Sequence, residues 1–227
     1  SRSRIDHTLE SVGKWLEIAP AIQMVICDGS GHDFSASVKA AYPHADVECL
    51  AFQNDRERVA SLGKGYGEGE IIRYAIARAD QVRRCEFLAK CTGKLWVTNF
   101  WECLQEWNGR FLCSAYFADV FSVKPTRFAY VDARFYLTDK AFYRQYFVNA
   151  HLTLGGPGGF GIEDSFRQIV VEKDLQGILF RHTPEIHGVG GGSGTYYKNN
   201  RRRRFKNLLR QKLVQSDQHF RPLFRGP

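Results

Sequence analysis

The sequence lacks any long apolar run. No stretch approaches the ~18 consecutive apolar residues that a membrane-spanning helix requires, so we predict no bilayer span. The opening residues Ser1–Asp6 also lack the apolar core of a secretory signal peptide, and no initiator Met precedes them. We therefore expect a cytoplasmic chain that is trimmed or partial at its N-terminus.

Paired cysteine motifs are absent as well. The cysteines form no Cys-x-x-Cys pair and have no histidine at zinc-finger spacing, which argues against a structural zinc site. Several lie in apolar runs, as in Val25–Cys27 and Phe111–Cys113. We expect buried thiols of a reducing compartment rather than a disulfide framework. The six are Cys27, Cys49, Cys85, Cys91, Cys103 and Cys113.

Excess positive charge is confined to one segment. The net charge is +8, and residues 198–212 alone carry eight lysines and arginines with no acid, so the rest of the chain balances to zero. A general nucleic-acid-binding domain spreads basic residues over its folded surface, so this distribution argues against nucleic acid as the partner. The eight are Lys198, Arg201, Arg202, Arg203, Arg204, Lys206, Arg210 and Lys212.

The same segment predicts an amphipathic helix over residues 198–214. Its apolar residues fall at i, i+3, i+4 and i+8, the pattern of a helix that lies in a membrane interface. Each basic residue near an anionic leaflet contributes about 1 kcal/mol, so we expect an anionic membrane surface as a partner. A solvated tail or an RNA contact is the alternative. The apolar positions are Phe205, Leu208, Leu209 and Leu213.

The order of predicted elements indicates an α/β protein. Strands and helices alternate over residues 1–120, which predicts one Rossmann-like domain with a mostly parallel central sheet covered on both faces. We place this domain at residues 1–197 and the basic tail at 198–227. The chain opens with a helix, so either the first strand lies upstream or the sheet is completed differently. Later elements include a strand at Gly177–Arg181 and helices after Asp139 and Gly161.

Four short motifs could carry chemistry. Asp28-Gly29-Ser30 ends an apolar strand, where ligands of open parallel sheets bind, although spacing alone slightly favours a tight turn. Lys64 and Gly65 lie in the glycine-rich segment 63–69 ahead of a helix, where backbone N–H groups hold phosphates in other proteins; a plain loop is the alternative.

The other two motifs lie further along the chain. Lys90, Thr92 and Lys94 follow a strand and would place cations at its ligand edge, unless they are merely solvated. Glu163 and Asp164 follow a Gly/Pro-rich loop; one could be a general base, and helix capping is the alternative. A second glycine-rich stretch, Gly188–Gly194, is flanked by His187 and Tyr196, and His187 on its own is more simply structural.

In this order, the motifs resemble the GT-A glycosyltransferases, most closely the small bacterial polysaccharide and lipopolysaccharide transferases. The resemblance covers roughly residues 5–197, with Gly63–Glu68 and Lys90–Lys94 as signature stretches. It implies that Asp28, Gly29 and Ser30 grip the base of a nucleotide-sugar donor. It also implies that Asp164, in a Glu-Asp motif, is the catalytic base, with Glu163 as the alternative.

One position departs from that family. Most members carry Asp-x-Asp at the end of the central strand, where it holds Mn²⁺ or Mg²⁺, but this chain has Lys90-Cys91-Thr92 there. Either the enzyme works without a metal, with lysines neutralising the leaving phosphate, or the motif is matched out of register. We assign no metal ligands. Asp132 and Arg134, in the nearest approximation to the motif, are assigned to the acceptor.

The resemblance implies transfer of a sugar to a hydroxyl of a glycan or lipid-linked acceptor in surface polysaccharide synthesis, at the inner face of the membrane. Donor contacts are expected from Lys64, Gly65, Lys90, Thr92, Lys94, His187 and Tyr196. The rival hypothesis is a nucleic-acid-binding or nucleotidyl-transferring protein that grips phosphates with Arg201–Arg204.

Overall fold

The computed structural model of the protein describes residues 2–155, 159–190, 196–197 and 201–225, with the backbone alone at 2–3 and 201–204. Most of the expected flap at Gly188–Gly194 and the start of the predicted tail helix at Lys198 lie outside these residues. The helices are α1 (Arg2–Ile18), α2 (Ser35–Ala41), α3 (Arg56–Leu62), α4 (Lys64–Arg78), α5 (Asp80–Arg84), α6 (Phe100–Gln105), α7 (Lys140–Tyr146), α8 (Ile162–Glu172), α9 (Arg201–Ser216) and the 3-10 turns η1 (Ala150–Thr153) and η2 (Arg221–Phe224).

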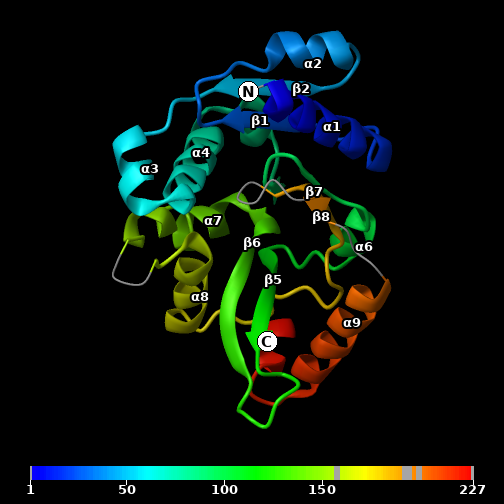
Figure 1. Ribbon diagram of the computed structural model, residues 1–227, viewed down its shortest axis with the longest axis vertical. Helices are drawn as coiled ribbons and strands as arrows, with labels where there is room; N and C mark the ends of the chain where they lie inside the picture. Colours follow the sequence, from blue (N-terminus) through cyan, green and yellow to red (C-terminus); the bar gives the residue numbers. More distant parts are fainter. Residues whose placement is uncertain (1, 156–158, 191–195, 198–200, 226–227) are drawn as a thin grey trace.

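The strands form three small sheets within the described residues. β1 and β2 pair in parallel, β3–β6–β5 is antiparallel, and so is β4–β7–β8. Figure 1 shows β1 and β2 at one end of the molecule with α1 and α2, and the long β5–β6 hairpin extending toward the other end beside α9. The strands are β1 (Met24–Asp28), β2 (Val47–Ala51), β3 (Phe87–Cys91), β4 (Leu95–Val97), β5 (Phe111–Ala118), β6 (Arg127–Asp139), β7 (Ile186–Val189) and β8 (Tyr196–Tyr197).

The mixed α/β class is confirmed, but the prediction of a mostly parallel central sheet is wrong. Among the described strands, only β1 and β2 pair in parallel. A parallel pair needs a crossover of about a dozen residues or more, and the short connection 119–126 can only return β6 antiparallel to β5. The expected strand at Gly177–Arg181 is also incorrect: it is an extended segment with a single parallel bridge from Leu179 to Cys113.

The middle strand β6 organises the core because it buries both of its faces. Tyr136 packs with Phe111, Phe147 and Phe166 in one cluster beneath α4, α7 and α8. Its neighbours Phe135 and Leu137 point the other way, into a second cluster with Trp15, Val97 and Phe100 from α1, β4 and α6. This alternation is the two-residue period of a strand. These three side chains of β6 are each at most 1% exposed.

The opening helix α1 is fixed to β4. The side chains of Ser11 and Trp15 both donate hydrogen bonds to the carbonyl oxygen of Leu95, at 2.7 and 3.1 Å. Through these bonds α1 covers β4, and its N-terminal end reaches the loop after β1.

The expectation of buried cysteines is met in part: Cys103 and Cys113 are buried, and the other four are partly exposed. All six cysteines are free thiols, and burial raises the pKa of Cys27 to about 11 and that of Cys103 to about 12. Such thiols are poor nucleophiles at neutral pH. Among the described helices, none combines the length and the apolar character that crossing a bilayer demands.

Candidate functional site

The first two turns of α4 are the place where the separate strand ends meet. Asn54, after β2, donates its backbone N–H to the carbonyl of Gly29 at 3.0 Å. A methyl group added to either Gly29 or Gly67 of α4 would overlap the Asn54 side chain, so the amide fits between the two glycines. The next residue of α4, Glu68, pairs with Lys90 of β3. The ends of β1, β2 and β3 therefore converge on α4.

Lys90 is the buried cation of this region, with 8% of its side chain exposed. Its ammonium donates to the Glu68 carboxylate, to Thr92 Oγ1 at 2.9 Å and to the carbonyl of Ala133 at 2.5 Å. An ammonium has three N–H donors, so these bonds use all of them. The charge of Lys90 is thus fixed at the site, but direct contact with a phosphate requires one of these partners to be displaced.

Glu163, in the first turn of α8, is the carboxylate best suited to exchange protons. Burial is the main cause that raises its pKa above the ordinary value of 4.5, and the charges of Glu68 and Asp132 add to the effect. Its own backbone N–H and the Lys90 ammonium oppose the rise only in part. A raised carboxyl pKa beside a buried cation is the environment in which general acids and bases are found.

Asp164, by contrast, caps the helix. Its Oδ2 accepts the backbone N–H of Gly161 at 3.0 Å, three residues earlier. This is the bond that the N3 side chain makes in a capping box, and it explains an acidic residue at this position without any catalytic role. The Glu-Asp pair therefore divides into a capping residue, Asp164, and a partly buried carboxylate, Glu163.

Asp132 and Arg134 of β6 form a second charged pair nearby. The guanidinium donates to both carboxylate oxygens, at 2.8 and 2.5 Å, and lies 5.0 Å from the ring centroid of Tyr197. The hydrogen bond to Asp132 is the largest factor that raises the pKa of Arg134, so the group stays charged. Both residues line a cleft of about 460 Å³ together with the stacked rings of Tyr116 and Tyr130.

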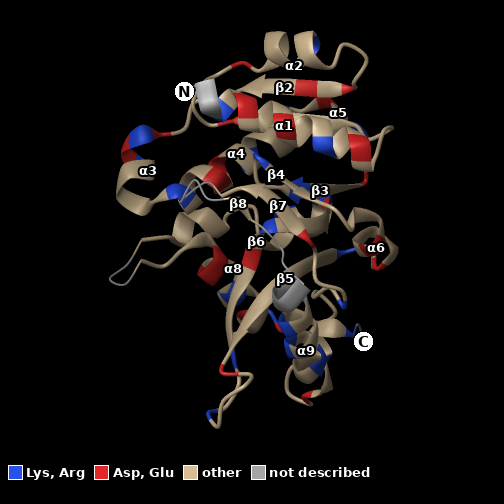
Figure 2. Ribbon diagram, turned by 45° about the vertical axis from the view of Figure 1, so that its right-hand side comes forward, with Lys and Arg blue, Asp and Glu red and all other residues tan. Residues whose placement is uncertain are grey.

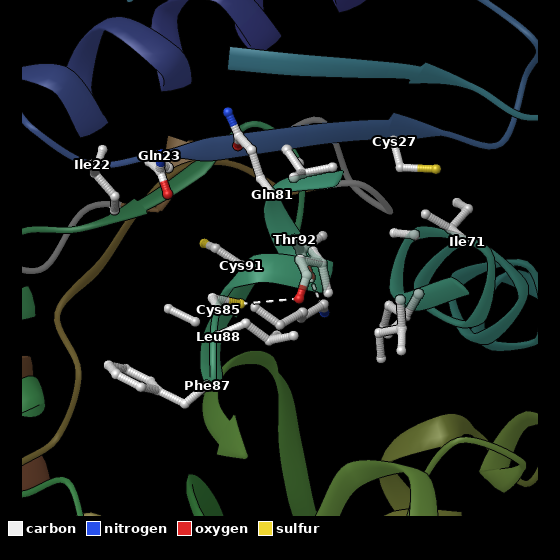
Figure 3. Close-up of a pocket in the computed structure, with 18 of the residues that line it drawn as sticks. Ile22, Gln23, Cys27, Ile71, Gln81, Cys85, Phe87, Leu88, Cys91 and Thr92 are labelled. Atoms are coloured by element: carbon white, nitrogen blue, oxygen red, sulfur yellow. Dashed lines mark hydrogen bonds between the residues drawn. The ribbon is translucent and has the colours of Figure 1, made fainter. Parts of the chain in front are cut away.

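A larger cavity, of about 870 Å³, lies on the other side of Lys90, between β1, α4 and β3. Figure 3 shows Cys27 from β1, Ile71 from α4, and Leu88 and Cys91 from β3 around it. Part of its polar lining comes from the convergence on α4, and the remaining walls are largely apolar. The size falls within the ~300–1,000 Å³ of small-molecule sites. The polar residues from the convergence are Asn54, Lys64, Glu68, Lys90 and Thr92, and Gln23 and Gln81 also line the cavity.

The carboxylate of Asp28 is held by hydrogen bonds from Arg4 and Ser30. Its Oδ1 accepts from the Arg4 guanidinium and from the backbone N–H and hydroxyl of Ser30, the last two at 2.8 and 2.6 Å. Burial alone would raise the pKa of Asp28, but the bonds from Ser30 and Arg4 lower it below 3.8. Asp28, Gly29 and Ser30 therefore form an ordered turn at the end of β1, adjacent to Asn54.

The glycine-rich segment 63–69 is a helix rather than a loop. Gly63 is the N-cap of α4, and Gly65, Gly67 and Gly69 lie inside the helix. A Cβ at Gly65 would press on Ile162 of α8, and one at Gly69 would overlap His151 of η1. The glycines therefore permit close packing of neighbouring elements on α4. Lys64 and Gly65 form the first turn of α4, as a phosphate site at a helix N-terminus requires, and Lys64 lines the cavity; the phosphate contact stays a prediction.

Three predicted donor residues lie apart from the Lys90 cluster. Lys94 occupies the β3–β4 turn with a left-handed φ of 70°. The ring of His187 stacks on Trp96 across β4 and β7, 6.4 Å between centroids, as the structural alternative predicts. The hydroxyl of Tyr196 donates to Glu10 of α1 at 2.5 Å. None of the three lines the cavity of Figure 3 or the Asp132–Arg134 cleft.

The residues at the Asp-x-Asp position do not fit a divalent metal. The place of the first carboxylate is taken by the buried Lys90, and Glu68 and Asp132 are each paired with a cation. In the described part of the chain, no three His, Cys, Asp or Glu side chains come together as a metal site. We therefore derive no chemical step through a metal.

Sequence reasoning missed Glu68 and Asn54. Glu68 lies in the segment 63–69, where the sequence analysis considered only the glycines and Lys64. Its role becomes visible only in its ion pair with Lys90 of β3. Nothing in the local sequence marks Asn54, which matters because it fits between two glycines far apart in the chain. Comparison with known proteins adds no further assignment, since no protein-family model, curated protein or solved structure matches the chain.

Proposed function

We propose that the protein is a nucleotide-sugar-dependent glycosyltransferase of the GT-A type, acting on a hydroxyl of a glycan or lipid-linked acceptor. The observation that carries the proposal is the position of Glu163. Its carboxylate has a raised pKa and is subject to the charges of Lys90 and Glu68, which line the cavity, and of Asp132, which lines the cleft. Glu163 itself lines neither space, but the charges that act on it belong to both, which makes it our candidate for the proton acceptor that group transfer to a hydroxyl requires.

The donor is assigned to the polar lining of the cavity. Asn54 Oδ1 is buried there without a hydrogen-bond partner among the described residues, so it can accept a bond from a base or ribose group of the ligand. Lys64 and the fixed charge of Lys90 favour the negative diphosphate at the same place. The apolar remainder of the cavity does not match a diphosphate, so the donor occupies only part of it.

The acceptor is assigned to the Asp132–Arg134 cleft. Charged groups that hydrogen-bond hydroxyls, and the partly exposed side chains of Tyr116 and Tyr130, suit a sugar ring. In the reaction, the acceptor hydroxyl gives its proton to Glu163 and its oxygen bonds to the anomeric carbon. The bond from that carbon to the phosphate oxygen breaks, and its electron pair leaves with the nucleotide. Asp164 holds the start of α8, and hence Glu163, in place.

Thermal unfolding in the presence of a panel of nucleotide sugars tests the donor assignment. We expect at least one compound to raise the melting temperature, with an affinity that Lys64→Met lowers at least ten-fold. The matched control is Lys173→Met, an exposed lysine at the far end of α8, which should bind as the wild type does. If no nucleotide sugar stabilises the protein, while RNA does so with steep salt dependence, the rival nucleic-acid function is correct.

A further inference from the structure

An ordinary surface helix turns its apolar side toward the protein, whereas helix α9 turns its apolar side outward. Its side toward the protein is mainly polar: Gln211 donates to the carbonyl of Phe180 at 2.8 Å, and Gln215 to that of Arg181 at 3.0 Å. Of its described apolar residues, only Val214 is buried. Its outward side carries four exposed apolar residues. They are Phe205 (70% exposed), Leu208 (50%), Leu209 (44%) and Leu213 (46%).

The loop that connects β5 and β6 extends this apolar surface. Phe121 and Val123 of the loop are both strongly exposed. The ammonium of Lys206 and the guanidinium of Arg210 lie 5.8 and 5.5 Å from the ring centroid of Phe121, which joins the loop to α9. An ordinary monomer does not gather so many large apolar side chains in one exposed area without a partner.

The same area is basic. In Figure 2, lysines and arginines follow α9 and reappear at the tip of the β5–β6 hairpin. The tip contributes Lys124 and Arg127, of which Arg127 is paired with Asp119 at 3.2 Å. Residues 201–212 contain no acid. Apolar side chains flanked by unbalanced positive charge match the interface of an anionic bilayer.

We propose that the outward side of α9 and the β5–β6 loop together form a surface that binds an anionic lipid bilayer. A second copy of the chain is a poorer occupant, because a symmetric contact would oppose the two basic segments. A nucleic acid is also a poorer occupant, since three exposed leucines would gain no apolar contact from a phosphate backbone.

This surface adjoins the proposed acceptor cleft. Lys206, Asn207 and Arg210 of α9 line the same cleft as Asp132 and Arg134. A bilayer on the outer side of α9 would therefore bring its head groups close to the mouth of the cleft. If the proposed function holds, the acceptor is a glycan carried on a membrane lipid, presented from the bilayer. Membrane binding itself does not depend on that function.

Vesicle flotation of the full chain tests the proposal. We expect the wild type to float with vesicles of phosphatidylglycerol and phosphatidylcholine, and not with phosphatidylcholine alone. Leu208→Asp and Val123→Asp should each lower the bound fraction at least ten-fold. Leu152→Asp is the matched control: Leu152 has a nearly equal exposure, 48%, but lies in η1, and this variant should float like the wild type.

The proposal is overturned if the wild type floats with neither vesicle or equally with both, or if Leu152→Asp behaves like Leu208→Asp. It is also overturned if Leu208→Asp instead dissociates a dimer in sedimentation velocity, or weakens RNA binding, without changing flotation. Donor binding in the thermal assay should be the same in Leu208→Asp and the wild type. A chain that floats but binds no nucleotide sugar would refute the proposed function and leave the membrane surface standing.

Discussion

Glu163 and Asp164 show how two adjacent carboxylates acquire different roles. Asp164 accepts the Gly161 N–H and so completes the start of α8, whereas Glu163 is partly buried and its pKa is affected by the charges of Glu68, Asp132 and Lys90. The sequence pointed to the pair but favoured Asp164 as the base. We propose the alternative, Glu163, as the base, because burial raises the pKa of its carboxyl group, whereas Asp164 already stabilises the start of α8.

The raised pKa of Glu163 has a measurable cost. Because the folded pKa lies above 4.5, the folded state holds a proton that the unfolded state has lost, and stability falls as the pH rises from about 4.5 through the folded pKa. Glu163→Gln should therefore raise the free energy of unfolding at pH 8, with a gain that shrinks toward pH 4. Urea denaturation at the two pH values measures this.

Glu57→Gln, at an exposed glutamate in the first turn of α3, is the control for that experiment and should not reproduce the gain. A Glu163→Gln variant that is less stable than the wild type at pH 8 would show that the carboxylate is held by favourable interactions. In that case the description of Glu163 as a carboxylate whose charged form is destabilised by burial would be wrong.

Lys90 and Glu68 form an ion pair that is largely out of water. Removing one partner of such a pair leaves a buried charge alone and costs about 3–5 kcal/mol, whereas removing both costs far less. Lys90→Met should therefore lose about 3 kcal/mol or more in urea denaturation, and the double variant Lys90→Met/Glu68→Gln should regain more than half of the loss. A single variant within about 0.5 kcal/mol of the wild type would mean that the pair does not form.

At the scale of elements, most strands and helices could be predicted from local patterns. The opening helix α1, the strand β1 that ends at Asp28, the helices α4, α7 and α8 and the tail helix α9 were each expected at the correct place. The errors arose where tertiary contacts decide. The two-residue strand β8 exists only by pairing with β7, and the segment 177–181 is extended without forming a strand. Neither outcome can be predicted from the local residue preferences for strand or helix.

The glycines of α4 illustrate the same limit. In sequence they indicate a loop, but in the structure they are contact points in a helix. Gly69→Ala should destabilise the fold by about 1–3 kcal/mol, because the new methyl overlaps His151. This is the net loss: the overlap must cost more than the ~1 kcal/mol that alanine gains over glycine in a helix, because the Cβ would lie only 2.2 Å from the His151 side chain. Thermal or urea unfolding provides the measurement.

Gly93→Ala is the matched substitution for Gly69→Ala. Gly93 lies in the β3–β4 turn, where a new methyl group would extend into open space, so its replacement should change stability by no more than about 0.5 kcal/mol. If Gly69→Ala is as stable as Gly93→Ala or more so, α4 and η1 do not pack as closely as described, and the glycines require another explanation.

At the scale of the whole molecule, the sequence predicted the α/β class but not the sheet. Alternation of strands and helices normally reports a parallel sheet, yet here β6 pairs antiparallel with both β3 and β5. The site could be predicted in part: the Asp28 turn, the 63–69 segment and Lys90 do converge, through Asn54 and Glu68. The predicted flap residues His187 and Tyr196 instead pack on β4 and α1, which no local signal revealed.

The charge balance of the site leads to a prediction about metals. Two fixed cations, Lys90 and Arg134, already neutralise Glu68 and Asp132, so turnover should survive EDTA. Assays with and without EDTA, followed by addition of manganese, measure this. Complete loss in EDTA with full rescue by manganese would show that the carboxylates rearrange around a metal, contrary to the arrangement described above.

The most direct test of the central claim is the release of nucleotide from the nucleotide sugar that binds most tightly, with water or a glycan as acceptor. The wild type should turn the donor over. General base catalysis contributes ~10²–10⁴-fold, so Glu163→Gln should lower turnover by about that factor with donor affinity unchanged, and Asp164→Asn should lower it less. If the wild type releases no nucleotide from any sugar donor, or if Glu163→Gln turns over as fast as the wild type, the protein does not act through this site as a glycosyltransferase.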